Sequence, residues 1–255
     1  MKLRENRLML IWLFWVGLMI FGCGVAYFQG WWGMINAGDP TKLSFFIVGV
    51  FVIGLMLNAR NAFVVNRELK NAMEVNNFCG ESYLNKEIFN VIWKKSNTSL
   101  IGAHIMNLNK IAAQQKSGDI DQSPLIEAMA AELEAPESWT RYIATILASL
   151  GFVGTLVGFL KSMQGLDTLM SVDKENAIQG LQRAVHGMGT AFYTTLVGVV
   201  FGALFLELLH RLIGNAITRL VITTTKISEV YIIPHLKSKF RDEKDLLGES
   251  GENQK

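Results

Sequence analysis

The sequence predicts an all-α, polytopic membrane protein with four transmembrane helices and a cytoplasmic helical segment. Half of the 255 residues are hydrophobic and only 18% are charged, which is more apolar than an ordinary soluble domain. Four long stretches carry no Asp, Glu, Lys or Arg: residues 8–38, 43–59, 142–160 and 184–206. Because a helix needs about 20 apolar residues to cross a bilayer core, each stretch predicts one membrane span.

The first two spans, at about residues 8–29 and 43–65, are predicted to form a transmembrane hairpin over residues 1–66. Their side chains are bulky and apolar, with almost no polar group at mid-membrane depth, so we expect them to face lipid. The second span reaches sufficient length only if it continues past Arg60, whose long side chain can extend to the headgroups.

The rest of the chain divides by polarity in the same way. Residues 67–139 are polar with a helical pattern and predict a cytoplasmic helical segment. Residues 140–213 predict a second transmembrane hairpin, with spans at about 140–163 and 184–210. Residues 214–255 predict a cytoplasmic helix followed by a flexible, charged tail.

The basic residues predict the orientation of these helices. Lys2, Arg4 and Arg7 precede the first span. Further basic side chains follow the second and fourth spans: Arg60, Arg67, Lys70, Arg211, Arg219 and Lys226. Since Lys and Arg concentrate on the cytoplasmic side of membrane proteins, both termini and the middle segment are expected in the cytoplasm.

Composition also excludes several classes of protein. The formal net charge is only +2, and no dense Lys/Arg cluster is present to bind nucleic acid. The two cysteines, Cys23 in the first span and Cys79 in the cytoplasmic segment, do not predict a disulfide. No nucleophile–base pair or metal-ligand cluster stands out, so neither an enzyme nor a bound metal or cofactor is predicted.

The last two spans carry small residues at spacings of three and four. They are Gly151, Gly154 and Gly158 in the third span and Gly187, Ala191, Gly198 and Gly202 in the fourth. Small residues at this spacing let two helix backbones approach closely, and for the glycines packing alone is the favoured interpretation.

Three threonines lie on the same stripes: Thr155, Thr194 and Thr195. A single membrane threonine can bond back to the carbonyl one turn earlier and means little. Three at matched depth indicate more, because hydroxyls at mid-membrane offer an ion a place to exchange its water.

The absence of carboxylates limits what this hairpin can do alone. A proton path needs a group that binds and releases protons, and no Asp or Glu lies in either charge-free stretch of the hairpin. If these helices conduct ions, another chain must supply the carboxylate. Glu207 and His210, at the inner end of the fourth span, have two interpretations. They could form a cytoplasmic ion exit, or, as we favour, an interfacial charge group in which Glu207 pairs with Arg211 one turn on.

Two motifs carry a resemblance to a known family. The run Gly-Phe-Val-Gly-Thr-Leu-Val-Gly at residues 151–158 resembles the penultimate membrane helix of the MotA/TolQ/ExbB ion-channel (stator) subunits, and Thr-Thr-Leu-Val-Gly at 194–198 resembles the last. The resemblance covers about residues 148–212 by motif and the rest by topology. TolQ and ExbB have a Glu five residues before the second threonine of the pair, where this chain has Thr190.

The resemblance implies an assembly. Five copies of the chain would surround two copies of a single-span MotB/TolR/ExbD-like subunit, whose membrane helix carries an Asp. In a bacterial inner membrane, H+ or Na+ passing that Asp would drive rotation, with Thr155, Thr194 and Thr195 on the ion path and the small residues packing helices at the pore. A non-conducting membrane scaffold, which assembles a complex through small-residue packing, is the alternative. The driven process also stays open: flagellum, outer-membrane energisation, gliding or defence.

Overall fold

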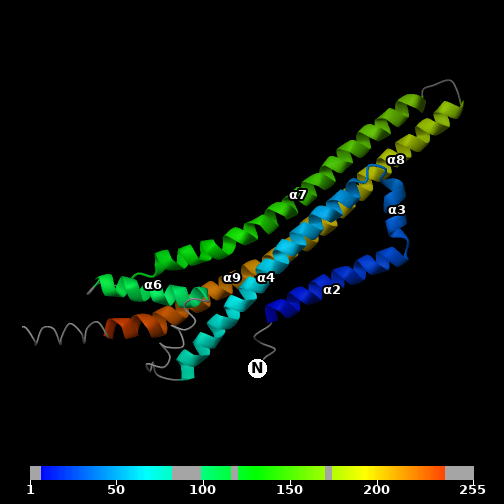
Figure 1. Cartoon of the computed structure of the whole chain (residues 1–255). Coiled ribbons are helices and arrows are strands. Elements are labelled where there is room, and N and C mark those ends of the chain that lie inside the picture. The colour runs from blue at the N-terminus through cyan, green and yellow to red at the C-terminus, as the bar shows by residue number, and fades with distance from the viewer. Residues whose placement is uncertain (1–6, 82–98, 116–119, 170–173, 239–255) are drawn as a thin grey trace, which may run out of the picture. The chain divides into compact units, whose positions relative to one another are not determined.

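The chain is all-helical in a computed structural model, which describes residues 7–81, 99–115, 120–169 and 174–238 (Figure 1). No strand occurs in these described ranges, and four helices are long and apolar enough to cross a membrane, so the predicted fold class is confirmed. The helices are α2 (Arg7–Phe28), α3 (Trp31–Gly38), α4 (Leu43–Glu81), α6 (Leu100–Gln115), α7 (Ser123–Leu169), α8 (Lys174–Gly198), η1 (Val199–Leu206), α9 (Glu207–Ile227) and η2 (Ser228–Ile232). The predicted tail, residues 241–255, lies outside the described residues.

Three of the membrane helices extend well beyond the predicted spans. α4 continues to Glu81, α7 begins at Ser123, and the last helical run passes from α8 through η1, α9 and η2 to Ser238. Polarity changes along each of these helices, but the helix itself does not stop there. The change in polarity therefore marks where a helix can leave the membrane rather than where it ends.

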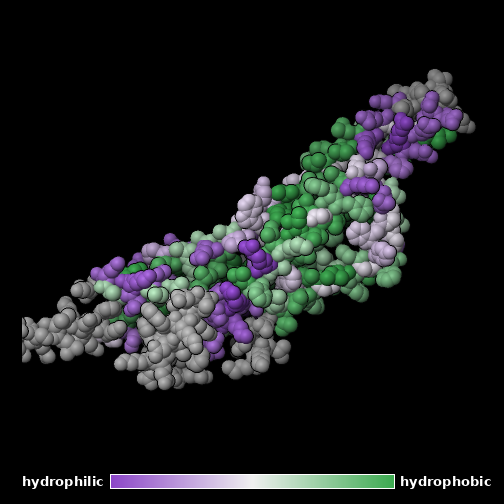
Figure 2. Space-filling view, in the orientation of Figure 1, coloured by the Kyte–Doolittle hydropathy of each residue, from purple (hydrophilic) through white to green (hydrophobic). Residues whose placement is uncertain are grey.

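The contacts divide the chain into two compact units. One, called here the membrane unit, consists of Met9–Ala62 and Pro136–Ile213. The other, the polar unit, consists of Met1–Leu8, Phe63–Ala135 and Gly214–Lys255. Hydrophobic side chains gather over the middle of α7 and α8, and hydrophilic ones over the end where α7 leads into α8 (Figure 2).

An apolar core holds the membrane unit together. Ile47 and Phe51 of α4 are buried with Leu147 of α7, Leu206 of η1 and neighbouring side chains. The ring of Phe51 stacks on Phe201 with centroids 4.8 Å apart. These contacts bring α4 against the α7–α8 hairpin at the level of η1, where the backbone adopts wider π-helical turns that often occur near functional sites.

A buried carboxylate sets the turn between α3 and α4. Asp39 accepts hydrogen bonds from the backbone N–H of Thr41 at 3.1 Å and of Ser44 at 2.8 Å. Burial alone would raise the pKa of Asp39, but the hydrogen bonds from Thr41 and Ser44 outweigh it and hold the pKa below its usual value. Asp39 is thus fixed as an anion that begins α4.

The polar unit is built around α6. The buried Glu68 accepts the backbone N–H of Leu100 at 2.8 Å, which favours the start of a helix at that residue. His104 of α6 is buried near Gln122, whose amide donates to Glu229 at 2.6 Å. Burial lowers the pKa of His104, and the hydrogen bond with Gln122 only partly opposes this shift.

Candidate functional site

The two helices of the second hairpin approach each other backbone to backbone. A Cβ atom on Gly158 would lie 2.6 Å from the carbonyl oxygen of Gly187 and 2.7 Å from the Cβ of Ala191. A Cβ atom on Gly198 would lie 2.8 Å from the Cα of Gly151. Real Cβ atoms do not come so close, so only glycine fits at these positions.

The remaining small residues of the two stripes lie in the same interface. Gly154 contacts the side chain of Thr194, and a Cβ atom on Gly202 would meet the Cβ of Leu147 at 2.6 Å. All seven small residues singled out in the sequence thus face the opposite helix within one chain. Their packing role is observed here, and their place at a pore stays a prediction.

Two of the three predicted threonines meet across this interface. The hydroxyls of Thr155 on α7 and Thr195 on α8 are hydrogen-bonded to each other, and both side chains are partly exposed. Thr195 Oγ1 also lies 2.9 Å from the carbonyl of Ala191 and 3.2 Å from that of Gly151. Each hydroxyl has one proton but two acceptor lone pairs, so the pair keeps oxygen lone pairs free for a water or a cation.

Thr194 occupies a different position from its neighbour. Its side chain is fully buried, and its hydroxyl donates to the carbonyl of Thr190 at 2.8 Å. Thr190 is buried as well and donates to the carbonyl of Gly38 at the end of α3, at 3.0 Å. Thr194 therefore packs between helices, and its burial gives no support to the predicted place of its hydroxyl on an ion path.

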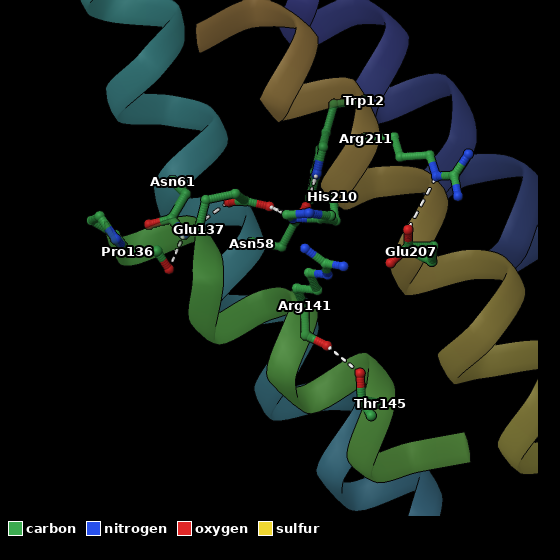
Figure 3. A network of polar contacts seen from close by, with 10 residues as sticks. All are labelled: Trp12, Asn58, Asn61, Pro136, Glu137, Arg141, Thr145, Glu207, His210 and Arg211. Atoms are coloured by element: carbon green, nitrogen blue, oxygen red, sulfur yellow. Dashed lines mark hydrogen bonds and ion pairs between the residues drawn. The ribbon is translucent and has the colours of Figure 1, made fainter. Parts of the chain in front are cut away.

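A second group of polar side chains joins four helices of the membrane unit (Figure 3). The carboxylate of Glu137 on α7 contacts His210 Nδ1 on α9 at 2.9 Å, Asn58 Nδ2 at 3.3 Å and Asn61 Nδ2 at 3.1 Å, both on α4. Asn58 Oδ1 in turn accepts the indole N–H of Trp12 on α2 at 2.8 Å. The Glu137 side chain is only 4% exposed, whereas that of His210 is 20% exposed.

The structure separates the two residues predicted at the inner end of the fourth span. Glu207 Oε1 accepts from Arg211 Nε at 3.1 Å. This is the ion pair, one helical turn apart, that the interpretation as an interfacial charge group expects. His210 instead faces Glu137. Sequence reasoning missed Glu137, Asn58, Asn61 and Trp12, and the available signal was weak: two amides one turn apart in a span and an acid directly after Pro136.

Together these features define a polytopic α-helical membrane protein whose last two spans pack tightly around a pair of hydroxyls. The chain belongs to the MotA/TolQ/ExbB proton channel family, whose model matches residues 97–225. The matched part includes α6, α7, α8, η1 and most of α9, and thus both motifs of the second hairpin. No curated protein and no solved structure matches the chain. The family is one of membrane proton channels and not of enzymes, which indicates an ion channel function.

Proposed function

We propose that the chain is the ion-conducting subunit of a proton- or sodium-driven rotary membrane motor. The observation that carries the proposal is the hydroxyl pair of Thr155 and Thr195, held between two helices that contain no charge at this level. Membership in a proton channel family supports conduction. The glycine packing supports a rigid frame, because helices in backbone contact hold the two hydroxyls in a fixed geometry.

The partner follows from the chemistry that the hairpin lacks. No carboxylate lies in residues 142–160 or 184–206, so a second chain has to bring the group that binds and releases the ion. A single-span subunit of the MotB/TolR/ExbD type, with an Asp in its membrane helix, fits this requirement. Two copies inside a ring of five copies of this chain would move that Asp past successive Thr155–Thr195 pairs.

The charges next to the spans and the family membership also bear on the location of the chain and on the ion it conducts. The family resemblance implies a bacterial inner membrane, and the basic residues next to the spans favour both termini in the cytoplasm. Sodium needs several oxygen ligands to replace its water, whereas a proton needs one titratable carboxylate and a chain of waters. Membership in a proton channel family favours the proton. At constant pH and fixed membrane potential, function that follows external sodium would contradict this choice.

The test is ion flux through reconstituted protein. The chain is placed in liposomes alone and together with the single-span membrane protein that co-purifies with it, and proton entry is followed with a pH-sensitive dye at a clamped potential. We expect flux only when both chains are present, and loss of flux when the partner's membrane Asp is changed to Asn. Robust flux through the chain alone would refute the need for a partner.

Removing a hydroxyl separates conduction from scaffolding. Thr195→Val keeps the shape of the side chain but removes its oxygen, so flux should be lost while the oligomer persists. Thr145→Val is the matched control, because Thr145 is also on this hairpin but its hydroxyl bonds only to its own helix, at the Arg141 carbonyl. Loss of the oligomer in Thr195→Val would favour the scaffold instead.

A further inference from the structure

The polar contacts around Glu137 fix which way the two neighbouring amides point. Asn58 Oδ1 accepts the indole N–H of Trp12, a group that can only donate, so the amide nitrogen of Asn58 must face Glu137. Asn61 Nδ2 donates to the carbonyl of Pro136 at 3.0 Å, a group that can only accept, which sets the orientation of the second amide. Both amides therefore present N–H groups to the carboxylate.

Three nitrogens thus converge on the two oxygens of Glu137. Besides the two amides, His210 Nδ1 lies 2.9 Å from Oε1. An ionised carboxylate can accept from both amides and from an Nδ1–H of His210. The site is built for an anion that is almost fully buried.

His210 is the group at this site that can exchange a proton. With Nδ1–H donating to the carboxylate, Nε2 is left with a lone pair, and the ring is exposed enough for water to reach it. When Nε2 takes a proton from hydronium, an imidazolium–carboxylate pair forms and one water is released. When the proton returns to water, the neutral ring keeps its hydrogen bond to Glu137, and no other bond changes.

The other charged side chains on the helices packed around His210 do not take the place of Glu137 as its partner. On α9, Glu207 is occupied by Arg211. Arg60 on α4 and Arg141 on α7 are exposed, where water and salt screen them. α2 contributes Trp12, which carries no charge. The fixed anion next to His210 is therefore Glu137.

We propose that Glu137 and His210 form a proton-binding site of this chain's own, which exchanges protons with water at one end of the channel hairpin. It deepens the proposed function and rests on it, because the pair would take up or release the protons that pass Thr155 and Thr195. Glu137 is the carboxylate partner, His210 carries the proton, and Asn58 and Asn61 are positioning residues that hold the carboxylate in place.

The decisive variant is His210→Gln, measured in the complex with its partner. Glutamine can still donate a hydrogen bond to Glu137 but cannot carry a proton. We expect proton flux to fall by about tenfold or more, as when a positioned proton-transfer group is lost, with the oligomer intact. His186→Gln is the matched control, because His186 is an exposed histidine of the same unit that contacts only the Gln182 carbonyl of its own helix. Wild-type flux in His210→Gln would overturn the proposal.

A second measurement does not depend on conduction. In wild-type protein labelled with ¹⁵N-histidine in nanodiscs, the His210 ring signals should show both the neutral and the protonated ring as the solution is acidified. Glu137→Gln should change the balance between the two forms. A His210 ring that never takes the second proton would overturn the proposal. If the wild-type complex conducts nothing, the proposed function fails, and the ring signals still decide whether the pair binds a proton.

Discussion

Replacing Gly158 with alanine should separate the two helices that hold the threonine pair. The new Cβ would lie 2.6 Å from the Gly187 carbonyl oxygen and 2.7 Å from the Ala191 Cβ, where ordinary contact begins at 3.4 Å. These neighbours are backbone and Cβ atoms that cannot rotate away, so α7 and α8 must move apart by about 1 Å in a densely packed interface.

The expected magnitude follows from two opposing terms. Overpacking of this kind costs about 1–3 kcal/mol, and the upper part applies because the shift also loosens the contacts around Gly151 and Gly198. Alanine gains at most about 1 kcal/mol over glycine in helix propensity. We therefore expect Gly158→Ala to lower the free energy of unfolding by about 1–2 kcal/mol, and to weaken the Thr155–Thr195 contact.

The assay is unfolding of the purified chain in mixed micelles with increasing SDS, followed by circular dichroism. Gly49→Ala in α4 is the matched control, because a Cβ there meets nothing within 4 Å. It carries the same change in propensity without the clash and should be as stable as the wild type or slightly more so. Equal stability of the two variants would refute the view that backbone contact between α7 and α8 requires glycine.

Thr155→Val should abolish conduction with little change in stability, whereas Thr145→Val should conduct normally; flux measurements with the partner present distinguish them. Because the pKa of Asp39 is lowered in the folded chain, the stability it contributes is present above the unfolded value of about 3.9 and is lost as pH falls through the folded value. The fall in Tm on acidification should thus be smaller in Asp39→Asn. His104 has a lowered pKa too, so its contribution is complete above about pH 6.5 and is lost as pH falls through the folded value. The amide protection factors in α6, corrected for the intrinsic pH dependence of exchange, should fall on mild acidification, and His104→Gln should remove that fall. Native mass spectrometry with the partner present should give five copies of the chain and two of the partner; a monomer or dimer would contradict the proposed ring.

Much of this fold could be predicted from sequence because membrane helices follow simple rules. The absence of charge located four spans, and the spacing of glycines located the helix surfaces that pack. The pairing of Glu207 with Arg211 was predictable because both residues lie on one helix, one turn apart. In each case the residues concerned are close in sequence or recur at a regular helical spacing.

What sequence reasoning missed depends on how each helix is rotated. Thr194 and Thr195 are adjacent, yet neighbouring residues of a helix point about 100° apart, so one is buried and the other meets Thr155. The contacts of Glu137 come from four helices that are far apart in sequence. No local pattern specifies which faces of four helices meet. Asparagine and tryptophan are also uncharged, so a sequence reading based on the positions of charged residues does not identify them.

The two polar sites of this chain, Glu137–His210 and Thr155–Thr195, explain why the proposed motor would need a partner with a carboxylate. Glu137 and Thr155 are separated by about 27 Å along α7, at the usual rise of 1.5 Å per residue. That distance is most of a hydrocarbon layer of about 30 Å. A proton could therefore bind His210 at one end, but over most of the layer this chain offers only hydroxyls, which do not hold a proton near neutral pH. The partner's Asp would supply the binding group at the level of Thr155 and Thr195. Changing that Asp to Asn should consequently stop flux while leaving proton binding at His210 intact; loss of both would mean that His210 does not bind its proton independently.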